Sequence, residues 1–265
     1  MTVRLFLRYD GSGFSGWQVQ NRGGSEDPLK PTVQGTLNKA LRELLKDDSI
    51  KVTGCSRTDA GVHALDYCAS FDIGQSPVPP DKICLALRPL LPETITVFRS
   101  EEAPEGFNAR YDTVKKTYKY VFYCDEFGIP SLNGNAWFVK TPEKPDISLM
   151  NEAASKLLGT HDFSAYCGDL KNAKTTERTI FQCSVSKHPV DTGSSRIDLY
   201  EIKVTGDGFL YNMVRIISGT LLYAGLGKMS PEDVAATLEN KARKDAGITA
   251  PPQGLYLAKV YLRSE

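Results

Sequence analysis

The chain has 265 residues, more than the commonest size of a single domain, so its length predicts two compact units. Hydrophobic residues make up 41% and charged residues 24% of the chain, a globular composition that excludes disorder over most of its length. The 32 Lys and Arg residues balance the 32 Asp and Glu residues. This zero net charge is a point against nucleic-acid binding, because phosphate contacts usually need a basic surface.

No feature of the sequence indicates export, a membrane span or a metal site. The first ten residues predict a strand and not a signal peptide, because Arg4 and Arg8 interrupt the apolar run. The most apolar later stretch, 209–227, contains Asn212 and Arg215, so we expect a buried helix and no membrane partner. The six cysteines form no Cys-x-x-Cys pair and have no ligand spacing with the three histidines. We therefore expect free thiols in a reducing, cytoplasmic location and no metal.

The first half of the chain predicts, in order, strand, helix, strand, strand, helix and strand. Alternating or β-branched runs indicate the strands, and apolar residues at helical spacing indicate the helices. The strands are expected at 3–9, 50–54, 67–73 and 94–99, and the helices at 33–46 and 80–90. Turn formers and polar residues fill 19–32, which predicts a mobile loop there.

The second half repeats this order with one additional helix. Its strands are expected at 115–124, 178–187, 196–205 and 255–262, and its helices at 146–158, 209–225 and 231–240. Two copies of a βαββαβ pattern predict an α+β protein of two related ferredoxin-like (RRM-like) units with mostly antiparallel sheets. We place the domains at 1–106 and 107–265, and we expect a cleft between them that suits an extended substrate.

A basic, tyrosine-containing run covers 107–120. It holds four cations, one anion and three tyrosines. Cations interleaved with aromatic rings are typical of a surface that binds phosphates and bases. A solvated strand has the same composition, so both interpretations stay open.

A polar cluster with small neighbours, 54–64 (GCSRTDAGVHA), lies between two predicted strands. Small residues leave room for a ligand beside Asp59, whose carboxylate can act as nucleophile, base or metal ligand. Most loop aspartates instead form a turn or cap a helix, and His63 can be a packed, hydrogen-bonded residue. From these residues alone the turn is the favoured interpretation of Asp59.

Residues 57–64 (RTDAGVHA) resemble the signature of the tRNA pseudouridine synthase A (TruA) family. Further blocks resemble the family in the expected order over nearly the whole chain. They lie at 9–11, 16–18, 32–35, 107–110, 116–120, 161–165, 178–180, 208–215 and 250–257. The resemblance implies an isomerase that converts uridine to pseudouridine in tRNA and needs no cofactor.

The resemblance also assigns roles to four residues. Asp59 matches the nucleophile, which attacks the target uridine at C6 of the base or at C1′ of the ribose. Tyr118 matches the tyrosine that stacks on the target base and takes part in proton transfer at C5. Arg215 matches an arginine that pairs with the catalytic carboxylate and holds it ionised. Arg57 matches an arginine that fills the gap left by the extruded nucleotide.

Each assignment has a structural alternative. Tyr118 can be a core tyrosine of its strand, Arg215 can extend its head to solvent, and Arg57 can bridge a phosphate. The resemblance further implies the anticodon stem-loop of tRNA (positions 38–40) as substrate and a homodimer. The alternative functions are a non-catalytic RNA-binding protein on the same scaffold and an acid/base hydrolase using Asp59 and His63. The second lacks paired carboxylates or a metal set at recognisable spacing.

Overall fold

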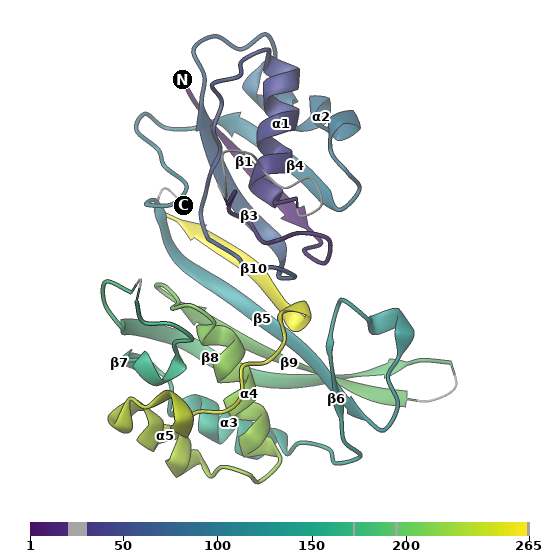
Figure 1. Ribbon diagram of the computed structural model, residues 1–265, viewed down its shortest axis with the longest axis vertical. Helices are drawn as coiled ribbons and strands as arrows, with labels where there is room; N and C mark the ends of the chain where they lie inside the picture. Colours follow the sequence, from purple (N-terminus) through teal and green to yellow (C-terminus); the bar gives the residue numbers. More distant parts are fainter. Residues whose placement is uncertain (21–30, 172, 194–195, 264–265) are drawn as a thin grey trace. The chain divides into compact units, whose positions relative to one another are not determined.

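The computed structural model describes residues 1–20, 31–171, 173–193 and 196–263, and the chain folds as two compact units (Figure 1). Unit 1 contains Met1–Val114 together with the chain from Tyr256 onward, and unit 2 contains Lys115–Leu255. Packing thus groups 107–114 and the last strand with the first unit, whereas the sequence pattern places the division after residue 106. Of the loop predicted at 19–32, residues 21–30 lie outside the described residues.

Unit 1 is built on a sheet with strand order β4-β1-β3-β10. The strands are β1 (Thr2–Tyr9), β3 (His63–Asp72), β4 (Ile95–Glu102) and β10 (Leu255–Leu262), and β2 (Thr53–Gly54) pairs with the end of β3. β1 is antiparallel to both neighbours, whereas β10 pairs in parallel with β3 through Tyr256 and Leu257. That parallel pairing is why the chain end belongs to unit 1.

The helix predicted at 33–46 is confirmed as α1 (Val33–Leu45). The hydroxyl of Thr32 caps it by accepting a hydrogen bond from the Gly35 amide (3.1 Å). Leu37, Leu41 and Leu45 recur at helical spacing and are buried against the sheet side of the unit. Lys46 ends the helix in the left-handed region, with φ 55°.

The single helix predicted at 80–90 is wrong. The segment forms α2 (Ile83–Ala86) between two short 3₁₀ turns, Pro80–Lys82 and Arg88–Leu90. Pro89 has no amide hydrogen and its ring crowds the carbonyl four residues earlier, so an α-helix cannot continue through it.

Unit 2 has strand order β5-β9-β8-β7, with each neighbouring pair antiparallel. Its strands are β5 (Thr113–Asp125), β7 (Gly159–Asp162), β8 (Glu177–Asp191) and β9 (Arg196–Gly206), and β6 (Trp137–Lys140) pairs in parallel with the end of β5. The pattern did not predict β6 and β7, which have four residues each and show too few side chains for a periodicity.

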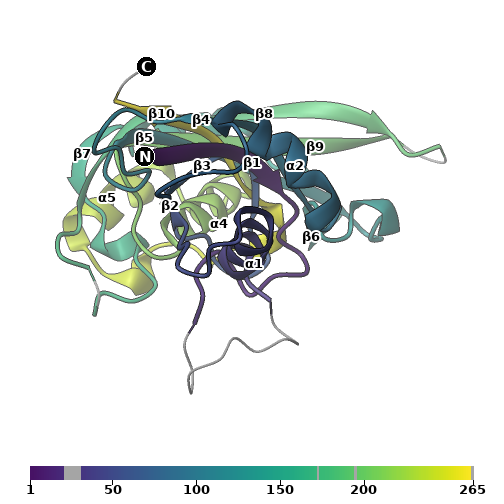
Figure 2. The ribbon, with the colours of Figure 1, turned by 90° about the horizontal axis from the view of Figure 1, so that it is seen from above.

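Three helices belong to unit 2: α3 (Ile147–Ser155), α4 (Met213–Gly225) and α5 (Pro231–Asn240). In Figure 2, α4 and α5 lie on one face of the unit 2 sheet, and α3 packs against β8 and α4. The helix predicted from residue 209 begins at Met213, because Asn212 adopts a left-handed conformation with φ 61°. Ser230 and Asp233 form a capping box that starts α5.

The predicted α+β class with mostly antiparallel sheets is confirmed in both units. α4 is the buried helix expected in the apolar stretch, with Ile216, Ile217 and Leu221 fully buried. Over the described ranges, no helix is both long and apolar enough to cross a bilayer.

Candidate active site

Asp59 lies on the loop that connects β2 to β3. Arg57 on this loop is exposed and Asp59 is half-buried, whereas Thr58 and His63 are buried, with exposed fractions of 7% and 2%. The Asp59 carbonyl accepts a hydrogen bond from the Val62 amide (3.2 Å), so a turn forms at this point. The loop therefore directs some of its polar residues to the surface and others to the interior.

The segment after β1 holds the backbone on both sides of Asp59. The Trp17 amide donates to the Thr58 carbonyl (3.0 Å), and the Gly61 amide donates to the Phe14 carbonyl (3.4 Å). The Tyr9 hydroxyl also forms a buried hydrogen bond with the Thr58 hydroxyl (2.7 Å). Residues directly before and shortly after Asp59 are thereby fixed to one neighbouring segment.

Two glycines allow this close approach. A Cβ atom at Gly11 would lie 2.0 Å from the Val62 carbonyl oxygen, and one at Gly16 would lie 2.6 Å from the Thr58 carbonyl oxygen. Gly16 also has φ +92°, a conformation that residues with a side chain rarely adopt. Any side chain at either position would push the segment after β1 away from the Asp59 loop.

An aromatic cluster supports the base of the loop. Trp17 stacks on Tyr67 with ring centroids 4.2 Å apart, and Tyr9 lies 5.6 Å from Tyr67. The Tyr67 hydroxyl donates a hydrogen bond to the Ser56 carbonyl. A Cβ at Gly54 would overlap both Trp17 and Tyr67, so the strand that leads into the loop lies directly on these rings.

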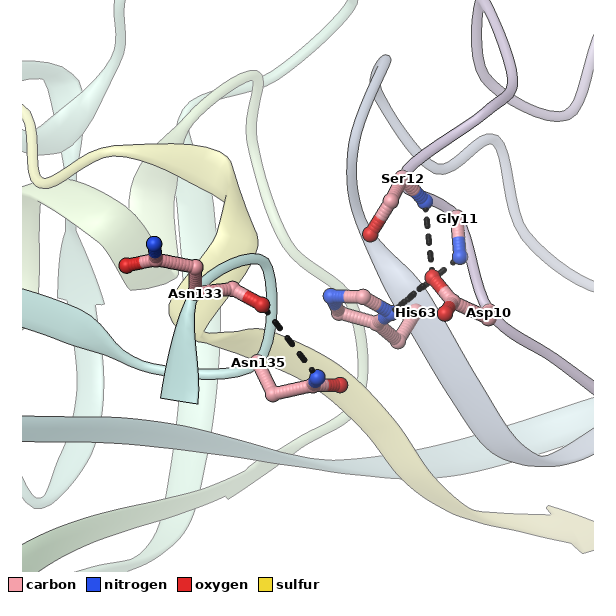
Figure 3. Close-up of polar contacts among 6 residues, drawn as sticks. All are labelled: Asp10, Gly11, Ser12, His63, Asn133 and Asn135. Carbon is pink, nitrogen blue, oxygen red and sulfur yellow. Dashed lines mark hydrogen bonds and ion pairs between the residues drawn. The ribbon is translucent and has the colours of Figure 1, made fainter. Parts of the chain in front are cut away.

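His63 ends the loop in a buried polar contact (Figure 3). Its Nδ1 atom accepts a hydrogen bond from the Gly11 amide (3.1 Å) and lies 3.2 Å from Asp10 Oδ1. Its ring stacks on Tyr256, with centroids 4.6 Å apart. This confirms His63 as a packed, hydrogen-bonded residue, a position poorly suited to acid/base chemistry on a bound substrate.

The charge of Asp10 is stabilised at this contact. Burial raises the pKa of Asp10, but hydrogen bonds from the backbone and side chain of Ser12 outweigh this effect, so the pKa of Asp10 is lowered. The Ser12 amide donates to Asp10 Oδ1 over 2.9 Å. Burial, together with the Asp10 charge, raises the pKa of Tyr256 to about 12, so this phenol stays neutral.

In unit 2, Tyr118 lies on β5 and is 7% exposed. The rings of Tyr118 and Phe209 pack edge to face, with their centroids 5.1 Å apart and their planes at 86°. Phe209 in turn packs over Gly206, where a Cβ would lie 3.2 Å from its ring. The Tyr118 ring is thus held in a defined orientation by the loop that precedes α4.

Arg215 lies in the first turn of α4 and is half-buried. Its Nε donates to the Ala250 carbonyl (2.6 Å), and its Nη1 donates to Asn212 Oδ1 (2.7 Å). Burial raises the pKa of Tyr120 strongly, and the Arg215 charge opposes that shift only in part. The guanidinium is therefore oriented by its own unit, and its predicted pairing with Asp59 stays a prediction.

The residues that hold the Asp59 loop have no predicted role of their own. Tyr9, Gly11, Gly16 and Trp17 appear only as matched blocks of the family resemblance. Their physical signal is the combination of closely spaced glycines and aromatic rings directly after a strand. That combination indicates close backbone packing without showing which distant segment is its partner.

Comparisons with known proteins point the same way as the motifs. A family model described as tRNA pseudouridine synthase matches residues 6–112 and 153–261. The chain is 43% identical over 259 residues to tRNA pseudouridine synthase A 2 of Clostridium tetani, covering 98% of both chains. It is 41% identical over 262 residues to tRNA pseudouridine synthase A of Bacillus subtilis, covering 98% of this chain and 99% of that one.

Proposed function

Because the chain belongs to the tRNA pseudouridine synthase family and is an isomerase of tRNA uridine, we propose that Asp59 is its nucleophile. The observation that carries this assignment is that the loop holds the backbone of Asp59 in place while leaving the residue partly exposed. Hydrogen bonds at Thr58 and Gly61 fix the backbone around Asp59, yet the residue itself is only half-buried. A weak nucleophile such as a carboxylate gains most from being held in one position.

The reaction needs no atom from outside the uridine except protons. The bond between N1 and C1′ breaks, and a bond between C5 and C1′ forms. C5 loses its proton and N1 gains one, so the product has the composition of the substrate. Asp59 attacks either C6 of the base, in which case it is eliminated after the bond between C5 and C1′ has formed, or C1′ of the ribose, in which case C5 displaces it as that bond forms.

We assign supporting roles to three further residues. Arg215 is proposed to pair with the Asp59 carboxylate and keep it ionised, and its two hydrogen bonds within unit 2 support a fixed guanidinium. Tyr118 is proposed to face the target base, supported by the orientation that Phe209 gives its ring. Arg57 is exposed, as a residue must be to replace the extruded nucleotide in the RNA stack.

We further propose the anticodon stem-loop, positions 38–40, as the site of modification, with a cytoplasmic homodimer as the active form. RNA helices are recognised largely through their shape and backbone, which suits modification at several neighbouring positions. The test is to incubate the protein with tRNA transcripts in which uridine occurs at one of these positions and cytidine at the others. Pseudouridine at 38, 39 or 40 is expected. Product only elsewhere in the tRNA would contradict the anticodon assignment and leave the isomerase activity intact.

A non-catalytic protein on the same scaffold would bind these transcripts without altering them. Parallel measurement of the tRNA dissociation constant and of pseudouridine content separates the two functions. Binding without product from any tRNA would favour the non-catalytic alternative.

A further inference from the structure

A concave pocket of about 930 Å³ lies on unit 1 beside α1. Among the described residues it is lined by α1, by the turn that follows α1 and by the segment Gln18–Val19, and Asp59 is not one of the lining residues. Its volume is within the range of about 300–1,000 Å³ that is usual for ligand sites.

The floor of the pocket is fixed by buried amides. Gln34 donates to the Val52 carbonyl (2.7 Å), and its Oε1 accepts hydrogen bonds from Gln18 Nε2 (2.7 Å) and the Val19 amide (2.9 Å). Asn38 accepts a hydrogen bond from the Val52 amide (2.9 Å). The pocket is therefore a built surface and not a gap between loosely packed side chains.

Its rim carries an excess of positive charge. Four cations (Lys39, Arg42, Lys46 and Lys51) and two anions (Glu43 and Asp48) line it. Lys39 and Arg42 are three residues apart on one side of α1, and Lys46 follows at the end of the helix. Lys39, Lys46 and Lys51 are exposed, and in the described part of the chain none of the three has a carboxylate within ion-pair distance.

In the basic run 107–120, by contrast, two of the lysines have partners within unit 2. Lys119 on β5 lies 3.7 Å from Glu201, and Lys115 lies over the ring of Phe181 at 5.9 Å. Part of the charge of that strand is thus compensated within unit 2. In a chain of zero net charge, the α1 pocket gathers three lysines, Lys39, Lys46 and Lys51, that have no ion-pair partner among the described residues.

We propose that this pocket binds the phosphodiester backbone of the tRNA substrate, at nucleotides other than the one that Asp59 attacks. The inference rests on the proposed function, which supplies the polyanion. Lys39 lies about 9 Å along the helix axis from Leu45, the last residue of α1, and Lys46 follows there, so the lysines face more than one phosphate of a strand. Flexible ammonium groups suit such contacts, because they bind phosphate without fixing one geometry.

The test compares two triple variants that remove the same charge. The pocket variant is Lys39→Gln, Lys46→Gln, Lys51→Gln, and the control variant is Lys140→Gln, Lys228→Gln, Lys244→Gln in unit 2. Arg42 is left unchanged because its Nε donates to the Ile50 carbonyl (2.9 Å) and supports the turn. The readouts are the tRNA dissociation constant at several salt concentrations and kcat at saturating tRNA.

For the pocket variant, the tRNA dissociation constant should rise about tenfold and the slope of log affinity against log salt should fall by about 2–3, because three phosphate contacts are lost. Its kcat should stay within about twofold of the wild type, and the control variant should change neither quantity by more than about twofold. Equal affinities and slopes for the two variants would overturn the proposal. Binding is measured without turnover, so absence of product from the wild type would contradict the proposed function separately.

Discussion

The contact between Gly11 and Val62 permits a sharp test of how the Asp59 loop is held. In a Gly11→Ala variant the new Cβ would start 2.0 Å from the Val62 carbonyl oxygen, and contacts under 3.0 Å are essentially never seen. The two segments must therefore separate by at least 1.0 Å, the difference between these distances. Val62 is hydrogen-bonded to the Asp59 carbonyl, so the displacement reaches the proposed nucleophile.

A displacement of this size should lower kcat about 100-fold, since misplacement of a reacting group by 1 Å costs about that factor. The forced overlap should also cost about 1–3 kcal/mol of unfolding free energy. In a chain of this length, each kcal/mol lowers Tm by about 2–4 °C. Pseudouridine formation and thermal unfolding measure the two effects on the same preparation.

Gly13→Ala is the matched control, because a Cβ at Gly13 meets no atom within 4 Å. It lies in the same segment and should leave both kcat and Tm near their wild-type values. If Gly11→Ala also retained wild-type kcat, the close packing of this segment would not be what positions Asp59.

Three further variants test other contacts. Tyr9→Phe removes the buried hydrogen bond to Thr58, and it should lower the free energy of unfolding by about 1 kcal/mol and also reduce kcat. The control Tyr166→Phe loses a similar buried bond in unit 2 and should lower stability without changing kcat. Equal loss of kcat in both variants would show that the bond at Thr58 has no specific role in positioning Asp59. Because its pKa is lowered in the folded protein, Asp10 stabilises the fold above about pH 4, and this contribution is lost as the pH falls through the lowered pKa. In urea unfolding, the free energy of unfolding of the wild type should therefore exceed that of Asp10→Asn near neutral pH, and the difference should shrink in acid. A difference that stays constant at every pH would refute this. Arg215→Lys keeps the charge but cannot make both hydrogen bonds of the guanidinium, to the Ala250 carbonyl and to Asn212. We expect kcat to fall at least about tenfold with Tm little changed. Normal turnover would show that a fixed guanidinium is not needed.

Local pattern predicted those elements that local interactions determine. Apolar residues at helical spacing in 33–46 were sufficient to locate α1, and long alternating runs located β5, β8 and β9. Apolar spacing at 80–90 predicts one helix, but Pro89 prevents the α-helix from continuing. The last strand groups with unit 1 through its pairing with β3, a contact that a periodic pattern does not encode.

At the candidate site, too, the sequence pattern predicted local features but not the contacts between distant segments. Composition and spacing favoured a turn at Asp59, and only the family resemblance gave it a catalytic role. The packing around it depends on contacts between residues far apart in sequence, such as Gly11 with Val62 and Tyr9 with Thr58. Such contacts arise from the antiparallel pairing of β1 with β3, and neither segment indicates its partner alone.

The central claim is that Asp59 forms and breaks the bond to uridine, and release of tritium from tRNA labelled at C5 of uridine tests it most directly. The wild type should release tritium, because C5 loses its proton in the reaction. Asp59→Asn should release none while binding tRNA within about threefold of the wild type, since the change removes the nucleophile but almost no contact surface. Full release by Asp59→Asn would contradict the assignment.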